Sequence, residues 1–128
     1  MRLVVTGSRD WSDKALLYRV LDEIHARYSI SVLFHGKARG ADTMAEQWAL
    51  ERGVSNFGNP YPPAYGQRGG TVRNGWLLDE AALLGARGVL VVAFPMKHST
   101  GTWNCVTQAK QRGLDIRLVR DHIEEAGT

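Results

Sequence analysis

The sequence predicts a Rossmann-like α/β sandwich, in which helices cover both faces of a mainly parallel sheet of about five strands. Short runs rich in aliphatic and β-branched residues alternate with stretches of about ten to fifteen residues that have helical periodicity. The short runs are apolar on both faces, which is typical of strands buried in a parallel sheet. Right-handed crossovers then place every strand-to-helix loop on one edge of the sheet, where ligands bind in this architecture.

The expected elements follow in chain order. The strands are predicted over residues 2–6, 30–35, 54–60, 88–94 and 114–119. The helices are predicted over residues 13–27, 41–52, 71–84 and 102–112. Ser12 is the expected cap of the first helix. Residues 61–70 contain several glycines and prolines and predict a long turn-rich loop, and the tail from about residue 120 is predicted to fray.

Bulk properties narrow the class of protein. The chain has 128 residues, which favours a single domain over residues 1–128. It is 44% hydrophobic and 23% charged, as in ordinary soluble globular proteins. The longest apolar run, residues 88–94, falls far short of the ~20 residues that cross a bilayer, and no secretory signal opens the chain, so no membrane partner is expected. The lone Cys105 excludes an internal disulfide and favours a cytoplasmic location.

Cations gather in the loops at the predicted binding edge. They lie in the loops at 7–11, 36–40, 61–70 and 95–102, or in the first turn of the helix that follows one: Arg9, Lys37, Arg39, Arg68, Arg73 and Lys97. Only Asp10, in a loop, and Asp42, just inside a helix, oppose them. Since helix N-termini add free N–H groups and partial positive charge, this edge should bind a phosphate-bearing ligand. The alternative is that each arginine is merely solvated.

Glycines mark the same loops at positions where the backbone turns sharply or a ligand comes close: Gly7, Gly36, Gly40 and Gly101. Neither G-x-G-x-x-G nor a Walker A sequence is present, so the usual dinucleotide and NTP signals are missing. Gly101-Thr102 at a helix start predicts either an anion-binding nest or a plain helix cap. No spacing of His, Cys and carboxylates predicts a metal site, and no cofactor is expected.

Four segments together resemble a known superfamily. They are "VTGSRDW", "HGKARGADTMAEQWA", "GGTVRN" and "VVAFPMKHSTGTWNCVTQA". In this order and spacing they resemble the SLOG superfamily, and above all its YpsA/YspA-like small Rossmann proteins, some of which occur in bacteriophages. The resemblance spans roughly residues 2–119. It implies a nucleotide-binding Rossmann-like domain, because the superfamily also holds the LOG phosphoribohydrolases, the single-strand DNA-binding DprA and nucleotide-sensing domains.

The LOG enzymes carry a P-G-G-x-G-T-x-x-E motif, which this chain keeps only in part. Pro95 and the Gly101-Thr102 pair match it, whereas Met96 and Lys97 replace the two phosphate-holding glycines in a loop that is two residues longer. By this resemblance the retained positions imply phosphate binding.

The catalytic half of that motif is missing. The position of the catalytic glutamate holds Cys105, while Arg73 matches the LOG arginine in the preceding helix. Glycosidic cleavage passes through an oxocarbenium-like state that a carboxylate stabilises, and here only Asp10 or Asp42 would be near enough to replace it. We therefore assign no catalytic residue.

The expected function is binding of a phosphate-bearing nucleotide or nucleotide-derived ligand, as a sensor or a sequestering protein. Phosphoribohydrolase activity and DprA-like binding of single-stranded DNA are the alternatives, and nucleic acid is the less favoured partner because the cations form no stripe with interleaved aromatics. The resemblance also implies a homodimer that uses the helices at 41–52 and 71–84. The expected ligand-binding residues are Gly7, Ser8, Arg9, Gly36, Arg39, Gly40, Arg73, Asn74, Lys97, Gly101 and Thr102.

Overall fold

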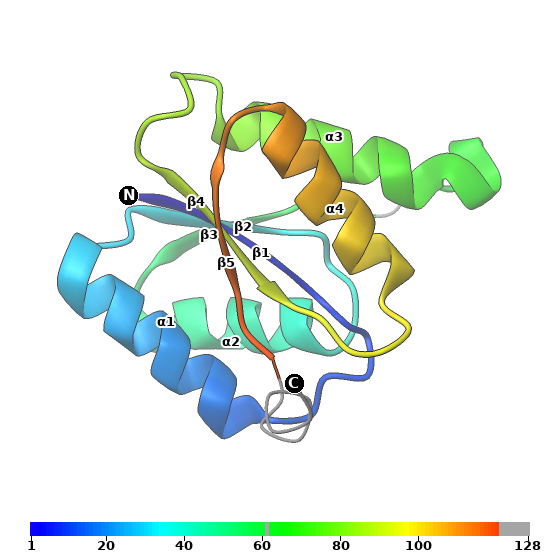
Figure 1. The fold of residues 1–128 in the computed structure, drawn as a ribbon. Helices are drawn as coiled ribbons and strands as arrows, with labels where there is room; N and C mark the ends of the chain where they lie inside the picture. The colour runs from blue at the N-terminus through cyan, green and yellow to red at the C-terminus, as the bar shows by residue number, and fades with distance from the viewer. Residues whose placement is uncertain (61, 121–128) are drawn as a thin grey trace.

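The computed structural model, which describes residues 1–60 and 62–120, confirms the Rossmann-like architecture and the five-stranded sheet (Figure 1). The strands are β1 (Arg2–Gly7), β2 (Val32–His35), β3 (Ser55–Gly58), β4 (Val89–Phe94) and β5 (Asp115–Leu118). They are all parallel and lie in the order β3-β2-β1-β4-β5. The three inner strands are β2, β1 and β4, and the carboxyl ends of β1 and β4 lie side by side in the middle of one edge.

Helices cover both faces of this sheet. They are α1 (Lys14–Tyr28), α2 (Ala41–Arg52), α3 (Gly69–Ala81) and α4 (Thr100–Gln111), and a short 3-10 helix, η1 (Pro63–Arg68), precedes α3. Figure 1 shows α1 and α2 on one face, and α3 and α4 on the other. Neighbouring residues of β1 divide between the two cores, since Leu3 and Val5 pack with α1 and α2 while Val4 packs under α3 and α4.

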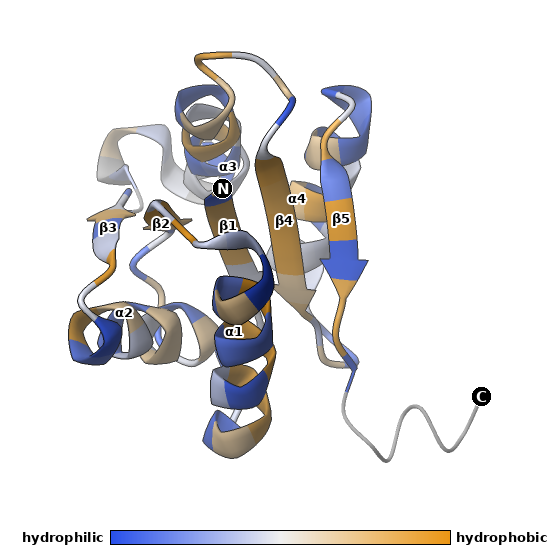
Figure 2. Ribbon diagram, turned by 90° about the vertical axis from the view of Figure 1, so that its left-hand side faces the viewer, coloured by the Kyte–Doolittle hydropathy of each residue, from blue (hydrophilic) through white to orange (hydrophobic). Residues whose placement is uncertain are grey.

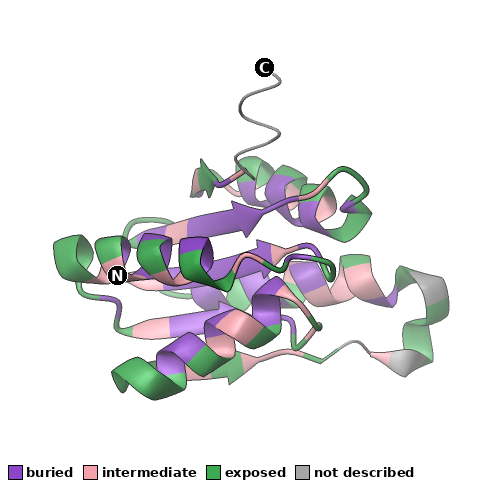
Figure 3. Ribbon diagram, turned by 90° about the horizontal axis from the view of Figure 1, so that it is seen from below, coloured by how far each residue is buried: buried purple, intermediate pink, exposed green. Residues whose placement is uncertain are grey.

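The strands differ in how far they are buried. β4 reads VLVVAF and is apolar along its length, whereas the edge strand β5 reads DIRL and alternates polar with apolar residues (Figure 2). Seen from below, the middle of the sheet and the inner sides of the helices are buried, and the outer sides are exposed (Figure 3). The two cores therefore hold the central strands rigidly, and the loops at their carboxyl ends start from fixed positions.

Three of the differences from the predicted boundaries concern the starts of helices. Asp13, not Ser12, caps α1, because its side chain accepts the Leu16 N–H at 3.0 Å. The loop predicted over residues 61–70 contains a short helix: η1 occupies Pro63–Arg68, with a proline in its first turn, and α3 begins at Gly69. Helix α4 begins at Thr100, two residues before the predicted start, because Ser99 takes the N-cap position.

Two further expectations concern the C-terminal tail and the absence of a membrane partner. The tail predicted to fray, residues 121–128, lies outside the described residues. Among the helices that the structure describes, none has the length and apolar character needed to cross a membrane.

Candidate functional site

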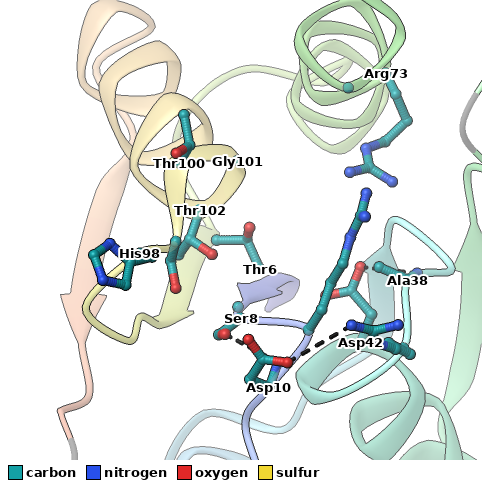
Figure 4. A pocket seen from close by; sticks show the side chains of 15 residues that line it. Thr6, Ser8, Asp10, Ala38, Asp42, Arg73, His98, Thr100, Gly101 and Thr102 are labelled. Atoms are coloured by element: carbon teal, nitrogen blue, oxygen red, sulfur yellow. Dashed lines mark hydrogen bonds and ion pairs between the residues drawn. The ribbon is translucent and has the colours of Figure 1, made fainter. Parts of the chain in front are cut away.

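A cavity of about 360 Å³ opens at the carboxyl ends of β1 and β4, between the start of α4 and the loops that precede α1 and α2 (Figure 4). Figure 4 shows Arg73 entering from α3, opposite Thr100 and Thr102 of α4. Its lining consists of Thr6, Gly7, Ser8, Arg9, Asp10, Ala38, Arg39, Asp42, Gly70, Arg73, His98, Ser99, Thr100, Gly101 and Thr102. The lining thus combines three arginines with small residues and hydroxyls.

The turn after β1 is fixed by its own backbone. The Ser8 N–H donates to the carbonyl of Phe94 at 2.9 Å, and the Ser8 carbonyl accepts from the amide of Ala41, the first residue of α2, at 3.2 Å. Gly40 permits this contact, because a Cβ there would overlap the Ser8 carbonyl oxygen and its φ of +78° is strained for any other residue. The turn places the exposed Arg9 at the cavity and leaves Gly40 packed behind its wall.

The first turn of α4 presents free backbone donors to the cavity. Trp103 makes the first i to i−4 bond, to the Ser99 carbonyl at 3.0 Å. Among the described residues, the amides of Thr100, Gly101 and Thr102 therefore have no backbone acceptor. The Ser99 hydroxyl is not free for them, since it accepts the Met96 N–H at 2.7 Å. Three amides at the positive end of a helix form an arrangement that binds anions.

Arg73 is held in place by polar contacts on both sides. One guanidinium nitrogen donates to the Gly36 carbonyl, and Nε donates to Asn74 Oδ1 at 3.0 Å. Asn74 is itself buried, and its amide donates to the Gly101 carbonyl at 3.2 Å and to Asn104 Oδ1 at 3.1 Å. Asn74 thus ties Arg73 to the start of α4. Gly36 leaves the necessary space, because a Cβ there would overlap the guanidinium.

Asp42 is a buried carboxyl beneath the arginines. Its Oδ2 accepts the amide of Gly36 at 2.9 Å and that of Ala38 at 3.4 Å, so it organises the loop after β2. Its Oδ1 is buried and has no hydrogen-bond partner among the described residues. Burial raises the pKa of Asp42 to about 6, although the positive charges of Arg73 and Arg9 oppose the shift.

The structure brings most of the sequence-predicted site residues together. Those that line the cavity are Gly7, Ser8, Arg9, Arg39, Arg73, Gly101 and Thr102. Gly36 instead lines an adjoining cavity, while Gly40 and Asn74 lie behind the wall. Lys97 is exposed and lines neither cavity, because the loop after β4 turns at Met96–Ser99 and carries it outward.

Some lining residues were not in the predicted set. Thr6 is the next-to-last residue of β1, and Ser99 and Thr100 are the N-cap and first residue of α4, which begins earlier than the sequence pattern indicated. Two features of the sequence could have identified these residues: Thr6 follows the apolar run of its strand, and Ser99 and Thr100 lie at the start of a helix. Asp10 also lines the cavity and forms an exposed ion pair with Arg39 at 3.7 Å.

Other chemically active side chains belong to the cores. Cys105 is fully buried on the inner side of α4, and burial raises the pKa of its thiol to about 11. His35 is also fully buried, with Nδ1 accepting the Lys37 N–H, and burial lowers its pKa. Trp11 packs edge-to-face on Phe94, with ring centroids 5.3 Å apart. Over residues 1–60 and 62–120, no group of three His, Cys, Asp or Glu side chains is placed to hold a metal ion.

Comparisons with known proteins identify relatives of this chain. The model of the YspA, cpYpsA-related SLOG family (YAcAr) matches residues 1–63. Gene 61 protein of Mycobacterium phage D29 is 32% identical over 123 residues, which cover 90% of this chain and 93% of the phage protein. The X-ray structure of DNA processing protein A (DprA) from Streptococcus pneumoniae matches 95% of this chain with a TM-score of 0.72 and 19% identity. This chain spans 51% of that DprA chain, and the likeness concerns the fold alone.

Proposed function

Because the chain belongs to the YspA, cpYpsA-related SLOG family, we propose that it binds a phosphate-bearing nucleotide or nucleotide-derived ligand in the cavity at the carboxyl edge of the sheet. It would serve as a sensor of that ligand or as a protein that sequesters it. The single observation that carries the proposal is the convergence of the free amides at the start of α4 with Arg9 and Arg73 in one cavity.

The charges of the cavity favour a dianionic group such as a terminal phosphate. Three arginines line it against two carboxylates, of which Asp10 pairs with Arg39 and Asp42 accepts two loop amides through Oδ2. Arg73 presents a planar fork of donors whose orientation Gly36 and Asn74 fix. A phosphate bound between this fork and the α4 amides would be held from two opposite sides, as the arrangement in Figure 4 illustrates.

Binding without cleavage is the outcome that the side chains support. Cys105 stands at the position of the LOG glutamate, but it is buried in the core and does not line the cavity. Asp42 Oδ2 accepts two amides, and Oδ1 is buried from solvent, so neither oxygen can activate a water molecule without a rearrangement. The DNA-processing role named for the Streptococcus pneumoniae protein makes a single strand the second kind of ligand to test.

Calorimetric titration with the four ribonucleoside 5′-monophosphates and with the matching nucleosides tests this proposal. We expect at least one monophosphate to bind and its nucleoside to bind far more weakly, because the cavity recognises phosphate. Arg73→Ala should weaken binding by about 1.5–3 kcal/mol, the scale of a hydrogen bond to a charged group, which is roughly a 10- to 150-fold rise in Kd. Lys110→Ala, which removes an exposed cation near the far end of α4, is the control and should leave Kd unchanged.

Two results would contradict the proposal. The first is a nucleoside that binds as tightly as its monophosphate. The second is an Arg73→Ala protein that melts like the original chain and still binds with the original Kd.

A further inference from the structure

A second cavity of about 310 Å³ adjoins the first one. Its described lining consists of Arg9, Gly36, Lys37, Ala38, Arg39 and Arg73. Four of these residues, namely Arg9, Ala38, Arg39 and Arg73, also line the first cavity. The two cavities are therefore neighbours that share one wall of arginines.

The second cavity is unusual in its charge. Its described lining holds four cations and no carboxylate, whereas the first cavity includes Asp10 and Asp42. Asp10 lies 3.7 Å from Arg39, but within residues 1–60 and 62–120 neither Arg9 nor Lys37 forms an ion pair with a carboxylate. Like charges around one cavity repel one another, and a bound anion would relieve that repulsion.

Lys37 is held at this cavity in a conformation that few residues adopt. Its φ is 55°, in the left-handed region, where a lysine is strained. Its amide donates to His35 Nδ1 at 3.2 Å, and its aliphatic stem lies against Gly58 of β3, where a Cβ would overlap it. These contacts lay the stem along β3 beside the cavity that Lys37 lines.

We infer that the second cavity is an anion subsite of its own, so that the ligand carries two phosphate groups, one in each cavity. The inference rests on the proposed function, which supplies the phosphate in the first cavity. The chemistry that fits is a nucleoside with a terminal phosphate on one side and a phosphodiester on the other. A linear dinucleotide with a 5′-phosphate is the smallest molecule of this kind, and a single strand of nucleic acid presents the same groups.

Titration calorimetry with AMP and with the 5′-phosphorylated dinucleotide pApA tests the second subsite while the base stays constant. We expect pApA to bind about tenfold more tightly than AMP, because a second charged contact is made. Lys37→Gln should raise the Kd of pApA by about tenfold and leave that of AMP unchanged, since Lys37 does not line the first cavity. Lys110→Gln has the same charge change at a distant position and should alter neither Kd.

The outcomes distinguish a failure of the second subsite from a failure of the proposed function. If AMP binds and pApA gains nothing, or if Lys37→Gln weakens both ligands equally, the second subsite is wrong and the proposed function stands. If neither ligand binds, both are wrong. A long oligoadenylate strand distinguishes the source of the second phosphate: affinity equal to that of pApA supports a dinucleotide, and a much higher affinity supports a single strand.

Discussion

Replacing Asp42 with asparagine keeps the shape of the side chain and the oxygen that accepts the amides of Gly36 and Ala38. It removes a negative charge from a carboxyl that is only 4% exposed and whose Oδ1 has no partner among the described residues. The substitution therefore removes the buried charge and keeps the hydrogen bonds that organise the loop. The new amide group takes the place of Oδ1 and also lacks a partner there within the described part of the chain, so the cost of the charge sets an upper limit to the gain in stability.

The size of the effect follows from the pKa of Asp42. Burial raises it from 3.8 to about 6, and this value already includes the attraction of Arg73 and Arg9. A shift of about two units corresponds to roughly 3 kcal/mol at about 1.4 kcal/mol per unit. Because the folded state binds the proton more tightly than the unfolded chain, stability falls as the pH rises through the window from 3.8 to about 6. Above that window the ionised carboxylate costs its full amount.

Asp42→Asn should thus be more stable than the original protein by up to about 3 kcal/mol at slightly alkaline pH, and the difference should shrink toward zero near pH 4. Urea unfolding followed by tryptophan fluorescence at several pH values measures this difference. Asp115→Asn, at an exposed position on the edge strand β5, is the control and should show no such trend. A variant that is less stable than the original protein at alkaline pH would refute the reasoning, since the carboxylate would then be a net stabilising partner of Arg9 and Arg73.

Three further predictions concern the fold, the chemistry and the assembly. Gly40→Ala should destabilise the protein by at least about 2 kcal/mol in urea unfolding, because the new Cβ clashes with the Ser8 carbonyl and the φ is strained for alanine. Gly53→Ala is the control: its φ is similar but no atom of the described residues lies close to the new Cβ, so it should cost about 1 kcal/mol. Incubation with nucleoside monophosphates should release no free base by chromatography, because Cys105 is buried where a carboxylate would be needed, and rapid release would favour a hydrolase. Sedimentation should give a dimer of about twice 14.2 kDa through α2 and α3, as the family resemblance implies. A monomer at micromolar concentration would contradict this assembly.

The fold was predictable because its signals are local. The apolar runs of β1 and β4 identify buried parallel strands, and the helical stretches between strands imply the crossovers. The prediction missed the glycine-rich start of α3, because Gly69 and Gly70 have low helix propensity. In the structure Gly69 is buried, and tertiary packing overrides this low propensity.

Only those residues of the site whose position follows from the end of a strand could be predicted. The residues directly after β1 and the loop after β4 from His98 onward reach the cavity, because parallel strands end at one edge. The role of Asn74 could not be predicted from the sequence, because its contacts with Gly101 and Asn104 join two helices that are far apart in the chain. The place of Asp42 just inside a helix also did not indicate that the turn after β2 brings the Gly36 and Ala38 amides to its side chain.

The central claim is that phosphate binds between Arg73 and the start of α4, and an NMR titration of ¹⁵N-labelled protein tests it most directly. AMP should shift the amide resonances of Thr100, Gly101 and Thr102, which have no backbone acceptor among the described residues, and adenosine should leave them in place. The same titration of Arg73→Ala should need much more AMP for equal shifts. If AMP leaves these three amides unmoved, or moves only resonances far from the cavity, phosphate does not bind between Arg73 and the start of α4.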